Sequence, residues 1–415
     1  MKILKSTIGV TFALGVCSLV PAASADVFSP NFPVSELHAT GAGNTAGSFA
    51  ASAMMGGQGH SNQAIPLGWE SSIRTSCASL SGATPWPGGC NPSGMAQAVH
   101  NLTTRSWVQF TWADTDQVSA LNEIVASLQT WHSPGIIPIY GQADHWVAIT
   151  QVTATLSGSN WAIGNVKFFD GGPVGGTDGG TNSYESGLLS FSGSVFKNVY
   201  FKVIANINPA CDPCTTDPWY NKYVLMWEPP VEQMHTKLVA SFPRAPGVIQ
   251  GAMTEPLAQS LVFRALSTGG VSADPQIWNA ISGGVAGTAF EVNGVAPNGE
   301  RWDYFLVPIL SSSTAQVIAY AQLAADDGAY ESVQVLSTPT TFNPVNRGRA
   351  ETLARGALNK GESLTPGILT WDPRATTPFA KSPTFPYYEF GILSGNKEVG
   401  VVRVSLNKGS VARAL

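Results

Sequence analysis

Charge is scarce in this chain of 415 residues, because aspartate, glutamate, lysine and arginine make up only 12% of it. The 27 acidic residues outnumber the 22 basic ones, so the chain lacks the basic surplus that binding to nucleic acid or anionic lipid requires. Long apolar runs are also missing. After the first 25 residues, no stretch reaches the roughly 18 apolar residues of a membrane-spanning helix. We therefore expect neither nucleic acid nor a membrane as a partner.

Common cofactor and catalytic motifs are missing too. The sequence has no Gly-x-Ser-x-Gly nucleophile elbow, no phosphate-binding loop and no glycine-rich dinucleotide fingerprint. The cysteines offer no second nearby ligand pair of the kind that a structural zinc site needs. The sequence therefore predicts no cofactor and no metal.

The first 25 residues have the pattern of a secretory signal peptide. Lys2 and Lys5 precede a short apolar segment, and Ala-Ser-Ala ending at Ala25 offers a cleavage site of small residues. Removal of both lysines leaves 20 basic residues against 27 acidic ones, a net charge of −7. The composition, rich in glycine and poor in charge, is typical of a secreted or periplasmic bacterial protein.

Four cysteines remain after removal of this segment: Cys77, Cys90, Cys211 and Cys214. In an oxidising compartment their spacing suggests two disulfides, Cys77 with Cys90 and Cys211 with Cys214. A redox-active pair is the alternative for Cys211 and Cys214. A structural disulfide is favoured there, because the pair follows a predicted strand and opens no helix.

Composition divides the mature chain into four parts. Residues 26–65 are rich in glycine, alanine and serine and read as a lead-in, and residues 66–208 form a first domain. A linker at 209–219 precedes a second domain at 220–415. We expect both domains to be α+β.

In the first domain, apolar spacing predicts two helices followed by an antiparallel sheet. The helices are expected at 91–102 and 114–131, and the strands at 136–140, 145–156, 160–170 and 194–207. In the second domain, helices are expected at 254–266 and 349–358. Two hairpins are expected to turn at Asn298-Gly299 and Asp327-Gly328, and a final hairpin within 387–406.

Three residues of the first domain form a candidate catalytic set. His145 begins one strand and Asp170 ends the next, so antiparallel pairing can return the carboxylate to the histidine end of the sheet. A carboxylate on one ring nitrogen orients the imidazole and leaves the other nitrogen for a nucleophile. Cys90 stands before a predicted helix, where the helix N-terminus and an imidazolium both favour a thiolate.

At these positions the sequence resembles the papain-like cysteine peptidases, particularly the bacterial branch that includes the double-glycine, bacteriocin-processing type. The similar segments are "CNPSGMA" at 90–96, "HWVAITQV" at 145–152 and "KFFDGGP" at 167–173, within a region of about 85–205. The resemblance implies a papain-like fold and a triad of Cys90, His145 and Asp170. It also implies cleavage of a peptide-type bond in a peptide or protein substrate.

The competing interpretation is a binding or structural protein on the same scaffold. A disulfide between Cys77 and Cys90 would remove the nucleophile and leave a catalytically inactive chain. The second domain shows no set of catalytic side chains, and we expect it to bind substrate or a partner. The sequence makes no prediction of oligomeric state.

Overall fold

The computed structural model describes residues 26–28, 92–103, 108–113, 115–131, 135–139, 145–158, 160–170, 187–203, 219, 221–227, 239–296, 299–372, 375, 383–407 and 409–414. The predicted signal peptide and all the cysteines lie outside these residues, as does most of the expected lead-in. Asp26–Phe28 of that lead-in form strand β1, which pairs antiparallel with β4.

Both helices predicted for the first half are confirmed, as α3 (Pro92–Thr103) and α4 (Gln117–Trp131). Three of the predicted strands are confirmed as β3 (Gly135–Ile139), β4 (His145–Ser157) and β5 (Asn160–Asp170). Two further strands of this half are β2 (Val108–Ala113) and β6 (Gly187–Ser192). The expected second domain begins with two strands that were not predicted, β7 (Lys222–Trp227) and β8 (Val239–Ser241).

The prediction of a strand at 194–207 is wrong for its first residues. The chain there forms a short helix, α5 (Gly193–Val195), and a π-helical turn, η2 (Phe196–Tyr200). The β-rich composition suggested a strand, but Phe196, Val199 and Tyr200 recur at helical spacing and are all buried in the main core. Tertiary packing of these side chains therefore overrides their strand propensity.

From α6 onwards the second half follows its predicted order of helix, strands, helix and strands, and α7 is a helix that was not predicted. Its helices are α6 (Glu255–Thr268), the 3₁₀ turn η4 (Val271–Ala273), α7 (Pro275–Ile281) and α8 (Arg347–Arg355). Its strands are β9 (Val285–Ala286), β10 (Phe290–Gly294), β11 (Tyr304–Leu310), β12 (Val317–Ala324), β13 (Tyr330–Thr340), β14 (Glu362–Leu364), β15 (Ile368–Trp371), β16 (Tyr387–Ser394), β17 (Lys397–Ser405) and β18 (Val411–Ala414). The three predicted hairpins are β10–β11, β12–β13 and β16–β17.

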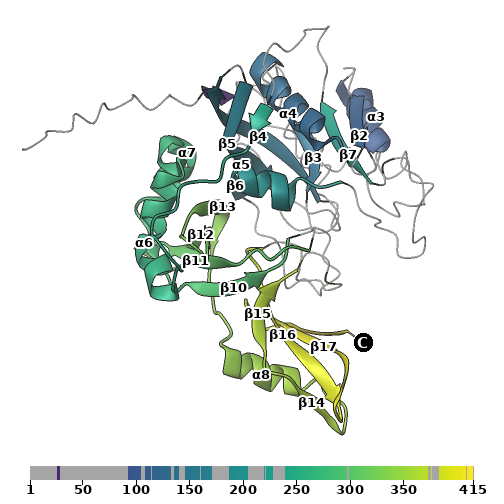
Figure 1. Cartoon of the computed structure of the whole chain (residues 1–415), viewed down its shortest axis with the longest axis vertical. Coiled ribbons are helices and arrows are strands. Elements are labelled where there is room, and N and C mark those ends of the chain that lie inside the picture. The colour runs from purple at the N-terminus through teal and green to yellow at the C-terminus, as the bar shows by residue number, and fades with distance from the viewer. Residues whose placement is uncertain are drawn as a thin grey trace, which may run out of the picture.

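Strand pairing runs from the first half into the second. In the order β2, β7, β3, β4, β5, β6, β13, β12, β11, β10, each strand pairs antiparallel with the next. β10 then pairs parallel with β15, which leads into the antiparallel strands β16, β17 and β18. β14 also pairs with β16, and in Figure 1 these last strands, β14 and α8 form the lower lobe.

The domain boundary expected at 209–219 does not divide the sheet. β7 and β8 follow it in the sequence, yet they pair with β2, β3 and β5 of the first half. The central junction is made by β6 and β13, whose registered pairs run from Phe191 opposite Ser332 to Gly187 opposite Leu336. The two halves therefore share one sheet.

Each face of this sheet has its own core. On the face of β11–β13 that α6 and α7 cover, Ala319, Ala321 and Leu323 belong to a core with residues of those helices (Figure 1). The opposite face contributes Tyr320 to a larger core that also includes residues of α4, β4 and β5. Alternation along the strands thus gives two apolar layers.

A β-bulge interrupts the alternation expected for β4. Ile149 pairs with Phe168 and Gln151 pairs with Lys167, so Thr150 is the extra residue. Ile149 therefore lies in the large core with Val152, whereas Gln151 lies on the opposite face. Strict alternation would put Ile149 and Gln151 on the same face.

Candidate functional site

The strands that carry the two predicted catalytic partners of Cys90 are neighbours. His145 is the first residue of β4 and Asp170 is the last residue of β5, and these strands pair antiparallel. The last registered pair towards this end is Ala148 opposite Phe169, so Asp170 follows directly at the edge where β4 begins. The backbone therefore brings the two positions to the same end of the sheet.

Cys90 itself lies outside the described residues. Helix α3 begins two positions later at Pro92 and packs against β2 and β7. β7 pairs with β3, and β3 pairs with β4 through Ile139 opposite His145. The helix is thus on the β3 side of the histidine strand.

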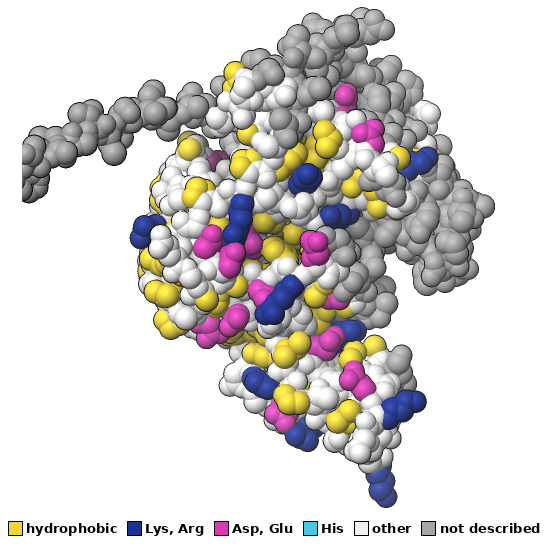
Figure 2. All heavy atoms as spheres, viewed as in Figure 1, with side chains coloured by type: hydrophobic (Ala, Val, Ile, Leu, Met, Phe, Trp, Pro, Cys, Tyr) yellow, Lys and Arg dark blue, Asp and Glu magenta, His cyan; other side chains and the backbone are white. Residues whose placement is uncertain are grey.

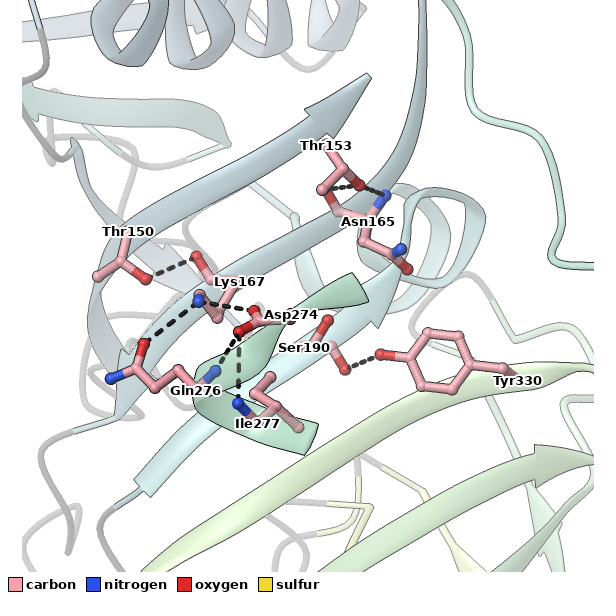
Figure 3. A network of polar contacts seen from close by, with 9 residues as sticks. All are labelled: Thr150, Thr153, Asn165, Lys167, Ser190, Asp274, Gln276, Ile277 and Tyr330. Atoms are coloured by element: carbon pink, nitrogen blue, oxygen red, sulfur yellow. Dashed lines mark hydrogen bonds and ion pairs between the residues drawn. The ribbon is translucent and has the colours of Figure 1, made fainter. Parts of the chain in front are cut away.

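A second constellation lies where the two halves of the chain meet (Figure 3). Lys167 of β5 is 5% exposed, and its Nζ lies 2.7 Å from Oδ2 of Asp274. The ammonium also donates to Oε1 of Gln276 at 3.3 Å. Burial makes this pair costly to break, because removal of one partner leaves an uncompensated charge away from water.

Asp274 is held in place by its second role as the N-cap of α7. Its Oδ1 accepts hydrogen bonds from the backbone N–H groups of Gln276 and Ile277 at 3.0 and 3.3 Å. Pro275 occupies the first helical position, where the missing N–H costs nothing. The carboxylate thus has one oxygen for the helix and one for Lys167.

Asn165, two positions before Lys167, makes a second link between the halves. Its Nδ2 donates to the carbonyl of Gly269 at 3.0 Å, and its backbone N–H donates to Oγ1 of Thr153 at 2.9 Å. On β13, the hydroxyl of Tyr330 donates to the carbonyl of Ser190 at 2.7 Å. The bond to Gly269 attaches the segment before η4 to β5, and the bond from Tyr330 attaches β13 to β6. Figure 3 shows the contacts of Asn165 with Thr153 and of Tyr330 with Ser190.

These groups surround a pocket of about 200 Å³ between the halves, called here the junction pocket. Its sheet side is lined by Gln151, Thr153, Asn165, Lys167 and Ser190, and its other side by the turn from Gly270 to Asp274. Val166 and Phe168, which alternate with the lining residues of β5, lie in the large core behind it. The pocket floor is therefore one face of the sheet.

A buried acid, Glu331, lies on the large-core face of β13. Its Oε1 accepts a hydrogen bond from the indole N–H of Trp302 at 2.9 Å, and its Oε2 has no partner among the described residues. Burial raises the pKa of this carboxyl to about 8, against the opposing effect of the Trp302 hydrogen bond. Glu331 is therefore mostly protonated at neutral pH.

Sequence reasoning missed the junction pocket. Two signals were present: a lysine inside the apolar run "VKFF" at 166–169, and an Asp-Pro pair at 274–275 that marks the start of a helix. Neither signal predicts that β6 pairs with β13, and this pairing brings the two segments together.

No protein-family model, curated protein or solved structure matches the chain. Within the described ranges, no three histidine, cysteine, aspartate or glutamate side chains converge into a group that could hold a metal ion. None of the helices in this part of the chain has the length and apolar character needed to cross a membrane. On the face shown in Figure 2, acidic and basic side chains of the described residues are interspersed.

Proposed function

We propose that the chain is a secreted or periplasmic papain-like cysteine hydrolase that cleaves a peptide-type bond. The observation that carries the proposal is the antiparallel pairing of β4 with β5, which places His145 and Asp170 at the same end of the sheet. The start of α3 two residues after Cys90 supports it further, because a helix N-terminus stabilises a thiolate.

In the proposed reaction, the thiolate of Cys90 attacks the carbonyl carbon of the peptide bond. His145 holds the proton taken from the thiol and returns it to the leaving amine. Water then hydrolyses the acyl-enzyme, with His145 accepting the proton of the water and returning it to the thiolate. Asp170 acts as a positioning residue that orients the imidazole.

The direct test is alkylation of the unreduced mature protein with iodoacetamide, followed by mapping of the labelled cysteine. An activated thiol reacts at pH 6, where an ordinary thiol with a pKa near 8.5 is almost entirely protonated. We expect label on Cys90 at pH 6. The rate should fall to that of a free cysteine in His145→Ala, while the control His100→Ala should leave it unchanged.

The competing class gives a distinct result. A Cys90 that takes no label, with a peptide linked through a disulfide to Cys77, would identify a binding or structural protein and end the hydrolase proposal. A labelled Cys90 whose rate at pH 6 is the same in His145→Ala would also end it, because the imidazole would then have no part in activation. The second half, joined to the first by β6 and β13, is proposed to bind substrate or a partner.

A further inference from the structure

The walls of the junction pocket are held in place by hydrogen bonds from both halves of the chain. Lys167 is bound by Asp274, and Asn165 by the carbonyl of Gly269. Gly270, at the lip, has a left-handed backbone with φ of +86°, and a Cβ there would come within 3.3 Å of the Asn165 amide nitrogen. A pocket with walls fixed in this way is preorganised for a ligand.

Several polar groups of the lining have hydrogen-bonding capacity left over. An ammonium has three donors, and Lys167 directs two of them to Asp274 and Gln276. The side-chain amide of Asn165 has two N–H donors at Nδ2, and one of them is used by the carbonyl of Gly269. One donor of Asn165 and one of Lys167 therefore remain for a ligand.

Charge limits the class of occupant. Lys167 and Asp274 neutralise each other across 2.7 Å, and no other described residue of the pocket lining is charged. An added anion would lie beside the Asp274 carboxylate, and an added cation beside the Lys167 ammonium, each without a free counter-charge. A neutral occupant avoids both costs.

Size and spacing limit it further. A volume of about 200 Å³ is far more than the roughly 10 to 15 Å³ that one water needs. Asn165 and Lys167 stand two residues apart on β5, a separation of roughly 6 to 7 Å, so one small functional group does not reach both. Hydroxyl groups spread over a ring can reach both residues, and each hydroxyl can either donate or accept a hydrogen bond.

We propose that the junction pocket is a binding site for a small neutral polyhydroxyl compound of about monosaccharide size. Its hydroxyls accept from Lys167 and from the Asn165 amide, and Gln151 and Ser190 complete the contacts from the sheet side. The proposal does not depend on the proposed thiol chemistry, because the described residues that carry it are other than the three predicted catalytic residues.

The test is saturation-transfer NMR on the mature protein with glucose, galactose and mannose, and with glucuronate and glucosamine as charged counterparts. We expect a saturable signal from at least one neutral sugar. We expect its charged counterpart to bind at least about tenfold more weakly, because an unpaired charge must be desolvated.

A matched pair of variants tests whether the NMR signal comes from binding in the junction pocket. Ala273 and Ser272 are neighbouring exposed residues of η4, but only Ala273 lines the pocket. Ala273→Leu should fill the pocket and abolish the signal, and Ser272→Leu should retain it, with thermal melts showing that both are folded. Gln151→Ala, which removes a half-buried lining amide, should weaken binding in a second, independent way.

The proposal is overturned if no neutral sugar gives a saturable signal, or if the signal survives in both Ala273→Leu and Gln151→Ala. Tighter binding of glucuronate or glucosamine than of the neutral sugars would also overturn it. Cys90→Ser should bind the neutral sugar as the native protein does, so failure of the hydrolase proposal and failure of this one are distinguishable.

Discussion

Lys167 of β5 and Asp274 at the start of α7 form a buried ion pair of 2.7 Å between residues 107 positions apart. The pair connects the sheet of the first half to a helix of the second and forms one wall of the junction pocket. Its energetic role can be measured directly, because each partner has a conservative replacement.

Replacement of Lys167 by methionine should destabilise the protein by about 3 to 5 kcal/mol, because Asp274 then keeps a charge in a site that is only 13% exposed. Urea denaturation at pH 7 measures the change. Lys397→Met, at an exposed position, is the control and should change stability by less than about 0.5 kcal/mol. Adding Asp274→Asn to Lys167→Met should recover part of the loss, since asparagine still caps α7 without a charge.

Gly193 should not tolerate a side chain. A Cβ there would lie 2.1 Å from the carbonyl oxygen of Ile163. Both clashing groups belong to the backbone of packed elements, so neither can move aside easily. We expect Gly193→Ala to cost roughly 1 to 3 kcal/mol or more, as overpacking in a core does. Gly283, with no atom within 4 Å of a Cβ, is the control, and Gly283→Ala should leave the denaturation midpoint nearly unchanged.

Glu331 should make stability fall as pH rises. Its pKa in the folded protein is about 8, above the ordinary value of 4.5, so the folded state binds the proton more tightly than the unfolded state. The stabilisation is complete below pH 4.5 and is lost between 4.5 and 8. The loss is at most roughly 5 kcal/mol, at 1.36 kcal/mol for each pKa unit.

Glu331→Gln should remove this dependence, because the amide does not ionise. The test is the difference in unfolding free energy between the variant and the native protein at pH 5 and at pH 8.5, with the exposed Glu291→Gln as control. The variant should gain relative to the native protein at the higher pH. Equal differences at both pH values would show that Glu331 has an ordinary pKa.

Glu362 and Arg413 should produce the opposite dependence in the lower lobe. Arg413 holds Glu362 through two hydrogen bonds of 2.7 and 2.8 Å, and this contact lowers the pKa of the carboxyl to about 2. A lowered pKa stabilises the folded state above pH 4.5, and the effect disappears as pH falls towards 2.

Glu362→Gln should therefore lower the melting temperature at pH 7, and the difference from the native protein should shrink as the pH is lowered through this range. The control is Glu351→Gln. Glu351 pairs with Arg355 on the exposed surface of α8, where such pairs contribute at most about 0.5 kcal/mol. A Glu351→Gln effect as large as that of Glu362→Gln would contradict the special role of the two-bond contact.

Local patterns predicted most of the elements. Apolar spacing located α3 and α4, and alternation located β5 from Asn160 to Asp170. The turn at Asp327-Gly328 identified the β12–β13 hairpin, where Gly328 has the left-handed φ of +70° that such turns require. These predictions succeeded because helix periodicity, strand alternation and tight turns depend on neighbours in sequence.

The failures share a different cause. The segment from Gly193 to Tyr200 has strand composition but folds as a helix, because burial of Phe196 and Tyr200 is decided by residues far away in the chain. The bulge at Thr150 likewise places Ile149 on the core face, where it pairs with Phe168. Alternation of residue types along one strand does not reveal a bulge, because a bulge depends on the partner strand.

For the candidate sites, the sequence by itself determined which chemical groups are available and which of them neighbouring strands can bring together. The backbone positions of His145 and Asp170 were predictable at one end of the sheet, because His145 begins and Asp170 ends consecutive antiparallel strands, whose geometry is local. Only the tertiary structure decided that Lys167 meets Asp274, since this contact depends on the pairing of β6 with β13 and on the packing of α7 over the sheet. Pairing between distant strands is determined by the summed free energy of burying many side chains. No short stretch of sequence is enough to predict it.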